Sequence, residues 1–252
     1  MGLADLEAVD GTGTGAGTSA AVELRVLSYN VRSLRDDRQL LVRIIRHFEA
    51  DIALVQEAPR FLFPRTQAEW LARSCGFAVA AGGAAATGPM VMVAPGIEVV
   101  AARNVLLPRT PGFHQRGIAL ARLAVGGARF AVGSTHLSLD AEERRWQTDL
   151  VLTHLADLGE KHRILAGDMN EFPGHPGWDH LATELHDGYA VAPWGREFTS
   201  PHRNPWRRID GVFASEGVEF VRCGVPEDFT DAEYEAATDH RPVLATLRVP
   251  IG

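Results

Sequence analysis

The chain has 252 residues, of which 46% are hydrophobic and 23% are charged, and its formal net charge is −7. These are values of an ordinary globular protein with enough apolar side chains for a sizeable core, so folding requires neither a disulfide scaffold nor a structural metal. The acidic balance argues against tight, non-specific binding to duplex DNA, which usually needs a basic face, although a metal at a carboxylate cluster leaves room for a nuclease.

The first twenty residues carry neither a folding pattern nor a targeting pattern. Residues 1–10 are acidic, whereas a secretory signal begins with basic residues and continues with an apolar stretch. Residues 11–19 read GTGTGAGTS, and this run lacks both the preceding strand and the GKS or GKT ending of a phosphate-binding loop. We therefore expect a flexible leader over residues 1–20 and one domain over residues 21–252.

Three further expectations concern the whole chain. No stretch approaches the roughly 20 apolar residues that a membrane-spanning helix needs. Cys75 and Cys223 lie far apart and lack the CxxC spacing of a metal site, so we expect two buried thiols, with a single disulfide left open. We expect a monomer located in the cytoplasm.

In the first half of the chain, short apolar runs alternate with helical stretches. Residues 22–26 alternate as a half-buried strand does, residues 40–48 have helical spacing, and residues 52–55 are typical of a strand buried on both faces. Several strand-like stretches separated by Gly and Pro lie between residues 79 and 132, and this block is predicted to be antiparallel.

In the second half, residues 141–158 give the clearest helix, with Asp140 as its N-cap. Its expected apolar stripe consists of Trp146, Leu150, Val151, Leu155 and Leu158. A strand over residues 163–166, a short helix over 176–185 and strands over 208–213, 218–223 and 242–249 complete the pattern. Strands outnumber helices, which favours packed sheets flanked by helices.

Polar side chains stand at the ends of four apolar runs, and two more, Asp239 and His240, stand just before the last run begins. Each residue alone has an ordinary explanation, as a turn, a cap, a salt bridge or a core histidine. Strand ends point into the clefts where function concentrates, so the whole set predicts one site. Its members are Asn30, Glu57, His136, Asp168, Asn170, Asp239 and His240.

The chemistry of this set is that of a hard metal ion. Glu57, Asp168, Asn170 and Asp239 offer oxygen atoms, and no Cys or paired His supplies the nitrogen and sulfur that zinc prefers. Oxygen ligands in small number suit Mg²⁺ or Mn²⁺, which keeps several waters and uses substrate phosphate for the rest. Histidines beside such an ion can transfer protons or stabilise charge near neutral pH.

Six segments make the chain resemble a known family over residues 24–247. SYNVRSL, VQE, STHLS, GDMNEFP, RRIDGVF and TDHRPV occur in the order found in the endonuclease/exonuclease/phosphatase superfamily, which includes deoxyribonuclease I-like and exonuclease III-like nucleases, neutral sphingomyelinases and inositol polyphosphate 5-phosphatases. The resemblance implies a four-layer α/β sandwich, in which two mostly antiparallel sheets pack face to face with helices outside. It also implies a Mg²⁺-dependent phosphoric ester hydrolase.

The resemblance further implies roles on the metal side of the site. Glu57 looks like the main metal ligand. Asn30, beside it, resembles a residue that orients this ligand or a phosphate oxygen, and Asp239 looks like a second metal-side carboxylate. The cofactor implied is Mg²⁺, or Mn²⁺ in its place.

Other roles concern the attacking water and the phosphoryl group. Asp168 resembles the carboxylate that aligns or deprotonates the water, and Asn170 resembles the amide that holds this nucleophile or the phosphate. His240 would contact the phosphoryl group, with Asp210 fixing its tautomer and charge. His136 takes the place of a histidine that acts as a general acid in the deoxyribonuclease branch. Since no upstream motif supplies the glutamate paired with it there, phosphate binding is the role expected here.

The remaining polar residues are assigned from weaker signals. Arg116 resembles a family arginine that contacts phosphate, and Arg207 lies on a basic, aromatic loop that suits an anionic substrate. Gly211 stands where many members have a tyrosine, which predicts a wider cleft on that side. His114 and His162 fit no motif, so we expect no functional role for them.

Two alternatives accompany the prediction of a small or lipid-like phosphoester substrate. The first is a DNA endonuclease or exonuclease of the same superfamily, which the net charge disfavours. The second is a catalytically inactive binding module on the same fold, which would have lost a site residue. The segment GDMNE also loosely fits calcineurin-like metallophosphatases, but the early DxH and later GNHE-like segments of that class are absent.

Overall fold

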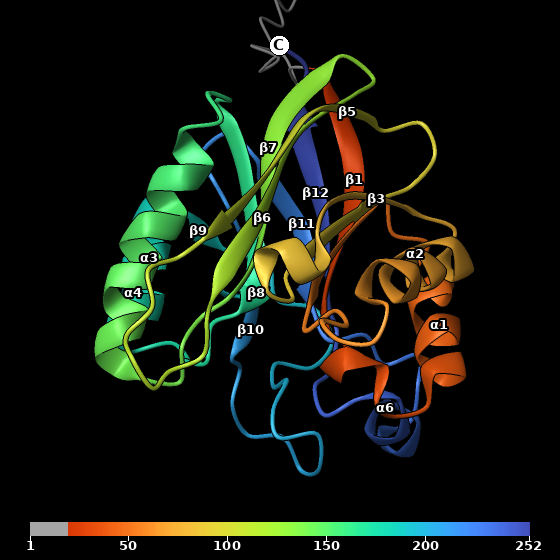
Figure 1. Cartoon of the computed structure of the whole chain (residues 1–252). Coiled ribbons are helices and arrows are strands. Elements are labelled where there is room, and N and C mark those ends of the chain that lie inside the picture. The colour runs from red at the N-terminus through yellow and green to blue at the C-terminus, as the bar shows by residue number, and fades with distance from the viewer. Residues whose placement is uncertain (1–19) are drawn as a thin grey trace, which may run out of the picture.

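Two six-stranded β-sheets packed face to face form the centre of the computed structural model, which describes residues 20–252 (Figure 1). The first sheet has the strand order β11-β12-β1-β2-β4-β3, and the second has the order β5-β6-β7-β8-β10-β9. The pairs β1–β2 and β7–β8 are parallel, and the other neighbours are antiparallel. The strands are Ala21–Asn30 (β1), Ile52–Gln56 (β2), Ala78–Gly82 (β3), Met90–Val93 (β4), Glu98–Leu106 (β5), Gly117–Val125 (β6), Ala128–His136 (β7), His162–Asp168 (β8), His186–Asp187 (β9), Asp210–Ala214 (β10), Glu219–Gly224 (β11) and Val243–Pro250 (β12).

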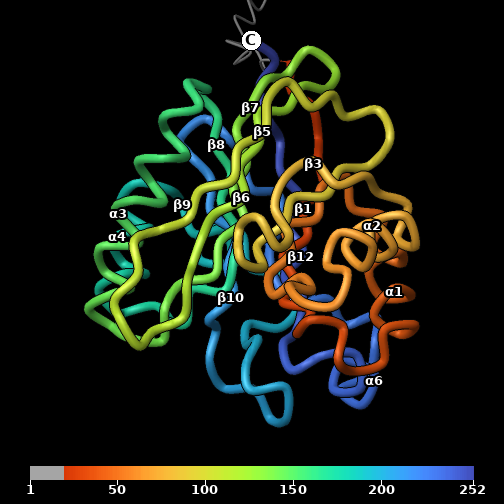
Figure 2. Tube along the Cα trace, in the orientation of Figure 1, coloured from red at the N-terminus to blue at the C-terminus, as the bar shows by residue number. Residues whose placement is uncertain are grey.

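Helices cover the outer face of each sheet, which completes a four-layer sandwich (Figure 1, Figure 2). Helices α1, α2 and α6 cover the first sheet, α3 and α4 cover the second, and the short α5 packs against β10 and β11. The predicted α/β sandwich is therefore confirmed. The helices are Arg38–His47 (α1), Pro64–Cys75 (α2), Ala141–Ala156 (α3), Pro176–Glu184 (α4), Gly188–Val191 (α5) and Asp231–Ala237 (α6), with 3-10 turns at Arg32–Leu34 (η1) and Gly83–Ala86 (η2).

Two expectations about the whole chain, the leader and the lack of a membrane-spanning helix, can be compared with the structure only over residues 20–252. Residues 1–19 of the predicted leader lie outside the part of the chain that the structure describes. Within residues 20–252, none of the helices combines the length and the apolar character needed to cross a membrane.

The core is divided among the layers by the alternation of each strand. In β2, Ile52 and Leu54 pack between the sheets, whereas Ala53 and Val55 pack under the helices of the first sheet. All five residues of β2 are buried, as the continuous apolar run predicts. The strand ends are therefore held rigidly from both faces, and a side chain at such an end is well positioned.

Helix α3 departs from the expected pattern. Its N-cap is Asp140, as predicted, and the Asp140 side chain accepts a hydrogen bond from the Glu143 N–H at 2.8 Å. The predicted stripe is only partly buried, because Trp146 and Leu150 are half-exposed. The N-terminal half of α3 instead buries polar side chains, namely Glu143, Arg144, Gln147 and Thr148.

The buried polar side chains of α3 hold neighbouring loops in place. Arg144 donates to the carbonyls of Ser138 and Leu139, both at 2.9 Å, and Glu143 accepts from the Thr110 N–H at 3.0 Å. Apolar periodicity does not reveal this end of the helix, because the helix meets loops with free backbone groups there rather than the face of a sheet.

Three helices, α2, α5 and α6, and one boundary were not predicted from the sequence pattern. Helix α2 begins at Pro64, which suits the first turn of a helix, and α6 begins with a capping box formed by Thr230 and Glu233. The predicted antiparallel block between residues 79 and 132 is divided, with β3 and β4 in the first sheet and β5 to β7 in the second. Local alternation does not reveal which sheet a strand joins.

Candidate active site

Strand register brings the predicted residues to one end of both sheets. In the second sheet His136 lies opposite Asp168 across the parallel β7–β8 pair, and Asp210 lies opposite Asp168 across the antiparallel β8–β10 pair. In the first sheet, Asn30 at the end of β1 lies opposite Gln56, and Glu57 follows directly. Because the sheets face each other, the two sets meet between them.

Asn30 connects the two sheets at this end. Its Nδ2 donates to Glu57 Oε1 at 3.2 Å and to Asp168 Oδ2 at 3.1 Å, and its Oδ1 accepts from the backbone N–H of Arg32 at 3.1 Å. With both ends of the amide engaged, Asn30 is fully buried and its orientation is fixed. This arrangement suits a residue that orients Glu57.

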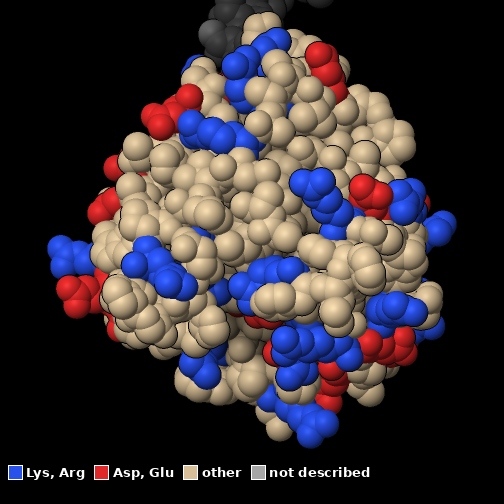
Figure 3. Space-filling model, viewed as in Figure 1, with Lys and Arg blue, Asp and Glu red and all other residues tan. Residues whose placement is uncertain are grey.

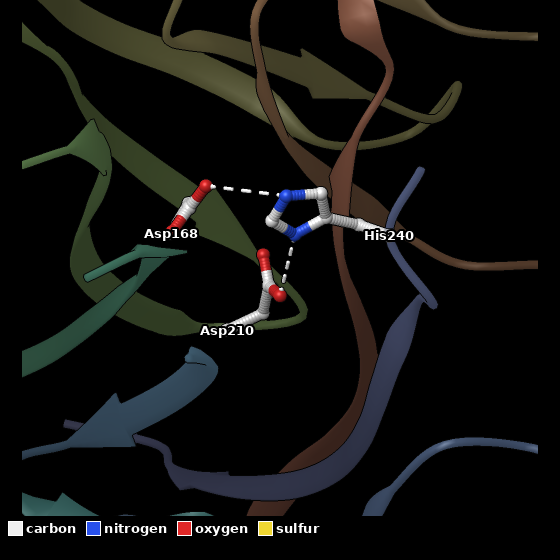
Figure 4. Close-up of side chains that lie close together, drawn as sticks. All are labelled: Asp168, Asp210 and His240. Carbon is white, nitrogen blue, oxygen red and sulfur yellow. Dashed lines mark hydrogen bonds and ion pairs between the residues drawn. The ribbon is translucent and has the colours of Figure 1, made fainter. Parts of the chain in front are cut away.

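His240 lies between two carboxylates (Figure 4). Its Nδ1 donates to Asp210 Oδ2 at 2.8 Å, and its Nε2 lies 3.6 Å from Asp168 Oδ2. Burial disfavours the charged ring, but the charges of Asp210 and Asp168 outweigh burial and raise the pKa of His240 to about 10. His240 is therefore an imidazolium at neutral pH, and both of its ring nitrogens carry a proton.

His136 has the opposite charge state. Its Nε2 lies 3.3 Å from Asp168 Oδ2, and its Nδ1 lies 3.9 Å from Glu57 Oε1. Burial lowers the pKa of His136 to about 3, helped by the charges of Arg116 and His240 and opposed by that of Asp168. A neutral histidine and a charged histidine thus share the same carboxylate.

Two residues of the site adopt left-handed backbone conformations. Glu57 has φ +53°, and Asn170 has φ +50°, which is uncommon for residues other than glycine and clusters at functional sites. The turn at Asn170 is held by its N–H donating to Asp168 Oδ1 at 3.0 Å and its Nδ2 donating to the Leu137 carbonyl at 2.9 Å. Gly88 packs against Glu57, where a Cβ would lie 3.3 Å from the Glu57 Cα.

A cavity of about 300 Å³ opens on this network and has two unlike walls. Glu57, Asp168 and Asn170 line one wall, together with the two histidines of the site. The second group of lining residues comes from loops beside these strand ends and carries cationic and aromatic nitrogen groups; we call the first group the strand-end wall and the second the loop wall. Its members are Arg35, Arg60, His114 and Arg116.

The loop wall contains one residue that was predicted to have a role, Arg116, and three that were not. Arg116 was predicted to contact phosphate, and its side chain lines the cavity with a buried Nε that has no hydrogen-bond partner among the described residues. Burial lowers the pKa of Arg116, and the charges of Asp168 and Glu57 oppose this. His114, for which no role was expected, lies on the same wall. Arg35 and Arg60 were not predicted, and their only sequence signal is closeness to Asn30 and Glu57.

Four predicted residues do not line this cavity: Asn30 and Asp210 are buried and contact residues that do, whereas Asp239 and Arg207 are engaged elsewhere. The carboxylate of Asp239 is paired with Arg32, whose Nε lies 3.1 Å from Asp239 Oδ2. Arg207 stacks its guanidinium over the Trp206 ring at 4.3 Å. Arg208, from the same loop, is buried in an ion pair with both carboxylate oxygens of Asp187 at 2.8 Å, so it supports the fold.

The expectation about Gly211 is wrong. Alternation along β10 directs this position away from the cleft, where a Cβ would lie 2.8 Å from Phe213 Cε2 and 2.9 Å from a ring carbon of Trp178. The rings of Phe213 and Trp178 already fill the space that a larger side chain would need. Gly211 therefore permits close ring packing behind the site and does not widen the cleft.

The donor set of the site fits a hard divalent cation. Asp168, Asp210 and His240 bring ligand atoms within 4.8 Å of one another, but the imidazolium of His240 already neutralises charge in this group. Glu57 is different, because its 35% exposed carboxylate has no cationic partner among residues 20–252. A half-exposed carboxylate facing the cavity beside neutral donors is a suitable oxygen ligand for such an ion.

The fold and the site define a class of protein, the metal-dependent phosphoric ester hydrolases. The chain belongs to the Endonuclease/Exonuclease/phosphatase family, whose model matches residues 27–240. This confirms the resemblance drawn from the six sequence segments. No curated protein sequence matches the chain significantly.

Solved structures share the fold at low sequence identity. An endonuclease/exonuclease/phosphatase from Bacteroides vulgatus is 20% identical, with a TM-score of 0.76 over 90% of this chain and 99% of the other. A mannosyl-6-phosphatase from Bacteroides thetaiotaomicron is 20% identical, with a TM-score of 0.74 over 89% and 99%. TDP2 from D. rerio, complexed with a single-strand DNA product, is 17% identical, with a TM-score of 0.70 over 89% and 98%.

Proposed function

We propose that the chain hydrolyses a small or lipid-like phosphate ester with Mg²⁺, or Mn²⁺, held at Glu57. The observation that carries this proposal is that the cavity is lined both by a carboxylate without a cation, Glu57, and by arginines without carboxylate partners among residues 20–252. Such a cleft is incomplete until it receives both a cation and an anion. A phosphate ester with its metal supplies both.

The metal would neutralise phosphoryl charge and favour in-line displacement at phosphorus. Asn30 would hold the Glu57 carboxylate toward it through its Nδ2 hydrogen bond of 3.2 Å. Asp239 was expected to be a second ligand. Its ion pair with Arg32 favours a role in which it helps to position the adjacent His240 segment and leaves Glu57 as the principal ligand.

Asp168 and Asn170 would prepare the attacking water. Asp168 is buried and accepts hydrogen bonds from Asn30 and from the Asn170 N–H, which fixes its orientation for the role of a base. The Nδ2 of Asn170 is used by the Leu137 carbonyl, so its Oδ1 faces the cavity as an acceptor for the water. The two residues together would hold the oxygen and receive its proton.

His240 and Arg116 would bind the phosphoryl oxygens. The imidazolium of His240 directs its Nε2 toward the cavity, where it donates to an oxygen that gains charge in the transition state. Arg116, which directly precedes β6 and lines the same cavity, offers a guanidinium. The neutral His136 would serve as a hydrogen-bond donor to phosphate, because its low pKa makes it a poor general acid at neutral pH.

A compact substrate is favoured over duplex DNA by the cavity itself. A volume of about 300 Å³ lies at the small end of ligand pockets and suits a head group or a sugar phosphate. The fold-related proteins act on both kinds of molecule, a mannosyl-6-phosphatase on one hand and TDP2 with its single-strand DNA product on the other. Their names therefore do not separate the two substrates.

The test compares hydrolysis of several classes of phosphate ester, each followed by its own product. Purified protein with Mg²⁺, Mn²⁺ or a chelator is assayed on bis-p-nitrophenyl phosphate, p-nitrophenyl phosphate, sphingomyelin, phosphoinositides, plasmid and abasic DNA. We expect metal-dependent turnover of a small or lipid ester, reduced by about a thousandfold in Glu57→Gln. Glu69→Gln removes a carboxylate exposed on α2 and serves as the matched control.

Two outcomes would contradict the proposal. Turnover restricted to plasmid or abasic DNA would favour the nuclease alternative. Absence of turnover on every substrate, with Glu57→Gln still abolishing metal binding, would favour a binding module on this fold.

We also infer that the protein works in a reducing compartment, as expected for the cytoplasm. Cys75 and Cys223 are both free and buried. Burial raises the pKa of the Cys75 thiol to about 12 and also raises that of Cys223. Both thiols are therefore protonated and unreactive at neutral pH, as the sequence predicts.

A further inference from the structure

The loop between β2 and α2 exposes three consecutive large apolar side chains. Phe61, Leu62 and Phe63 are 73%, 82% and 81% exposed. A contiguous apolar group of this kind is unusual on a protein surface and marks an interaction site. None of these side chains belongs to the buried clusters of residues 20–252.

The conformation of the loop is fixed by hydrogen bonds from a side chain of α2 to the loop carbonyls. The Gln67 side chain donates to the Phe61 carbonyl at 3.2 Å and to the Leu62 carbonyl at 2.6 Å. Leu62 and Phe63 have φ +53° and +62°, left-handed values that bulky residues rarely adopt. The outward direction of the side chains is therefore a property of a fixed turn and has a conformational cost.

Further apolar side chains surround the same cleft. Arg60, directly before the loop, lines the cavity, and so does Leu139, which is 73% exposed. Phe113 is 42% exposed and precedes His114, another cavity residue. The segments that carry these residues come from different parts of the chain, so the mouth of the cavity is bordered by apolar groups on more than one side.

Several cationic side chains at and near the mouth lack acidic partners, although the whole chain has a net charge of −7. Arg60, Arg65, Arg109 and Arg116 form no ion pair with any carboxylate of residues 20–252. Lys and Arg side chains gather across the lower middle of the face seen in Figure 3.

We propose that the loop Phe61–Phe63 docks the protein on an anionic phospholipid bilayer, with the mouth of the cavity facing the lipid. The apolar side chains enter the interface, and Arg60 and Arg65 lie at the level of the headgroups on either side. Each arginine near an anionic surface strengthens binding by a factor of about five. The anionic leaflet is the cytoplasmic one, in agreement with the compartment inferred above.

Phospholipid explains these features better than a single-stranded nucleic acid does. Nucleic-acid surfaces combine cations with aromatic rings that stack on bases. Leu62, the most exposed residue of the loop, and Leu139 are aliphatic and offer no ring for stacking, whereas they insert readily among acyl chains. Resting on the function proposed above, the inference assigns the substrate to phosphoesters whose headgroup projects from the same bilayer.

The docking is tested with the full chain and sedimented vesicles of phosphatidylcholine, with or without phosphatidylglycerol. We expect binding to the mixed vesicles that falls about tenfold or more in the double variant Phe61→Ser/Leu62→Ser. Val191→Ser, which removes a 55% exposed side chain on α5 near the opposite edge of the first sheet, should bind as the wild type does. Arg65→Glu should weaken binding to the anionic vesicles by at least about fivefold.

Activity separates docking from catalysis. Hydrolysis of a soluble p-nitrophenyl ester should agree within about twofold between the wild type and Phe61→Ser/Leu62→Ser, since these side chains do not line the cavity. Hydrolysis of a vesicle-embedded phospholipid should fall with vesicle binding. Vesicle binding without turnover of any ester would contradict the proposed function and leave the docking in place.

Other results would overturn the docking itself. Equal sedimentation of the wild type and the loop variant would do so, as would failure of the wild type to sediment with either vesicle. Tight binding of a single-stranded oligonucleotide that is lost in Phe61→Ser/Leu62→Ser, without vesicle binding, would reassign the loop to nucleic acid. An unchanged unfolding temperature confirms that the variant is folded.

Discussion

The two walls of the cavity are built in opposite ways. On the strand-end wall every charged group except Glu57 is already paired within the site, since Asp168 and Asp210 share the imidazolium of His240 and Asn30 bonds two carboxylates. On the loop wall Arg60 and Arg116 have no carboxylate partner among residues 20–252. The first wall is thus preorganised, and the second gains its partner only when an anion binds.

This difference predicts that the two walls affect different kinetic parameters, kcat and KM. Groups whose geometry is fixed before binding stabilise the transition state without reorganisation and so affect kcat. Cations without partners contribute mainly to holding the phosphate in both the ground state and the transition state, and so affect KM. Variants on the two walls should therefore separate the two kinetic parameters.

The largest effect is expected for the pair of His240 and Asp210. His240→Gln removes the donor at the phosphoryl group and should lower kcat about a thousandfold with little change in KM. Asp210→Asn leaves the His240 ring in place but removes the carboxylate that keeps it charged, and it should lower kcat about a hundredfold. Because Asp210 acts through His240, the double variant should be no slower than His240→Gln alone. Multiplicative losses in steady-state kinetics would show that the two residues act separately.

A smaller effect of the other kind is expected for Arg116. Arg116→Met keeps the length of the side chain and removes its charge, so it should raise KM about tenfold to fiftyfold with kcat within about threefold. Arg38→Met, on α1 over the Trp70 ring, removes an arginine that does not line the cavity and should change neither parameter. A kcat loss in Arg116→Met equal to that of His240→Gln would erase the contrast between the walls.

The pH dependence of stability should differ for the two histidines of the site in chelator-treated protein. The folded pKa of His240 is raised to about 10, so its contribution is complete below its ordinary value of 6.5 and is lost as pH rises toward 10. The folded pKa of His136 is lowered to about 3, so the folded state loses stability as pH falls from 6.5 toward 3. Each slope is at most about 1.4 kcal/mol per pH unit.

Urea unfolding across this range measures both slopes. His240→Gln should flatten the alkaline side, and His136→Gln should flatten the acid side. If either substitution flattened the opposite side, the assignment of one charged and one neutral histidine would be wrong.

The same contrast between the two walls explains which site residues could be predicted from the sequence and which could not. Glu57 and Asp168 stand at the ends of apolar runs and His240 stands just before the last strand, so these positions were predictable, and β-register then brings the strand ends together. The positions of Arg35, Arg60 and His114 depend on loop paths, which are set by distant contacts such as the hydrogen bond from the Thr110 N–H to Glu143. No local pattern encodes such a contact. The ion pair of Asp239 with Arg32 was not predictable for the same reason, because it depends on the left-handed turn that follows Asn30.

The smallest effect concerns the backbone that supports Glu57. Gly88 has φ +124°, and an added Cβ would lie 3.3 Å from the Glu57 Cα, so Gly88→Ala should cost about 1–2 kcal/mol of stability and shift the carboxylate. Gly96→Ala is the matched control, because Gly96 has φ +95° and no atom within 4 Å of its Cβ position. Both variants should lose stability in urea unfolding, Gly88→Ala by more because of its close contact, but only Gly88→Ala should bind the metal more weakly by calorimetry. Equal metal affinity in the two variants would mean that the Glu57 position tolerates displacement, and that the strand-end wall is less rigid than its hydrogen bonds indicate.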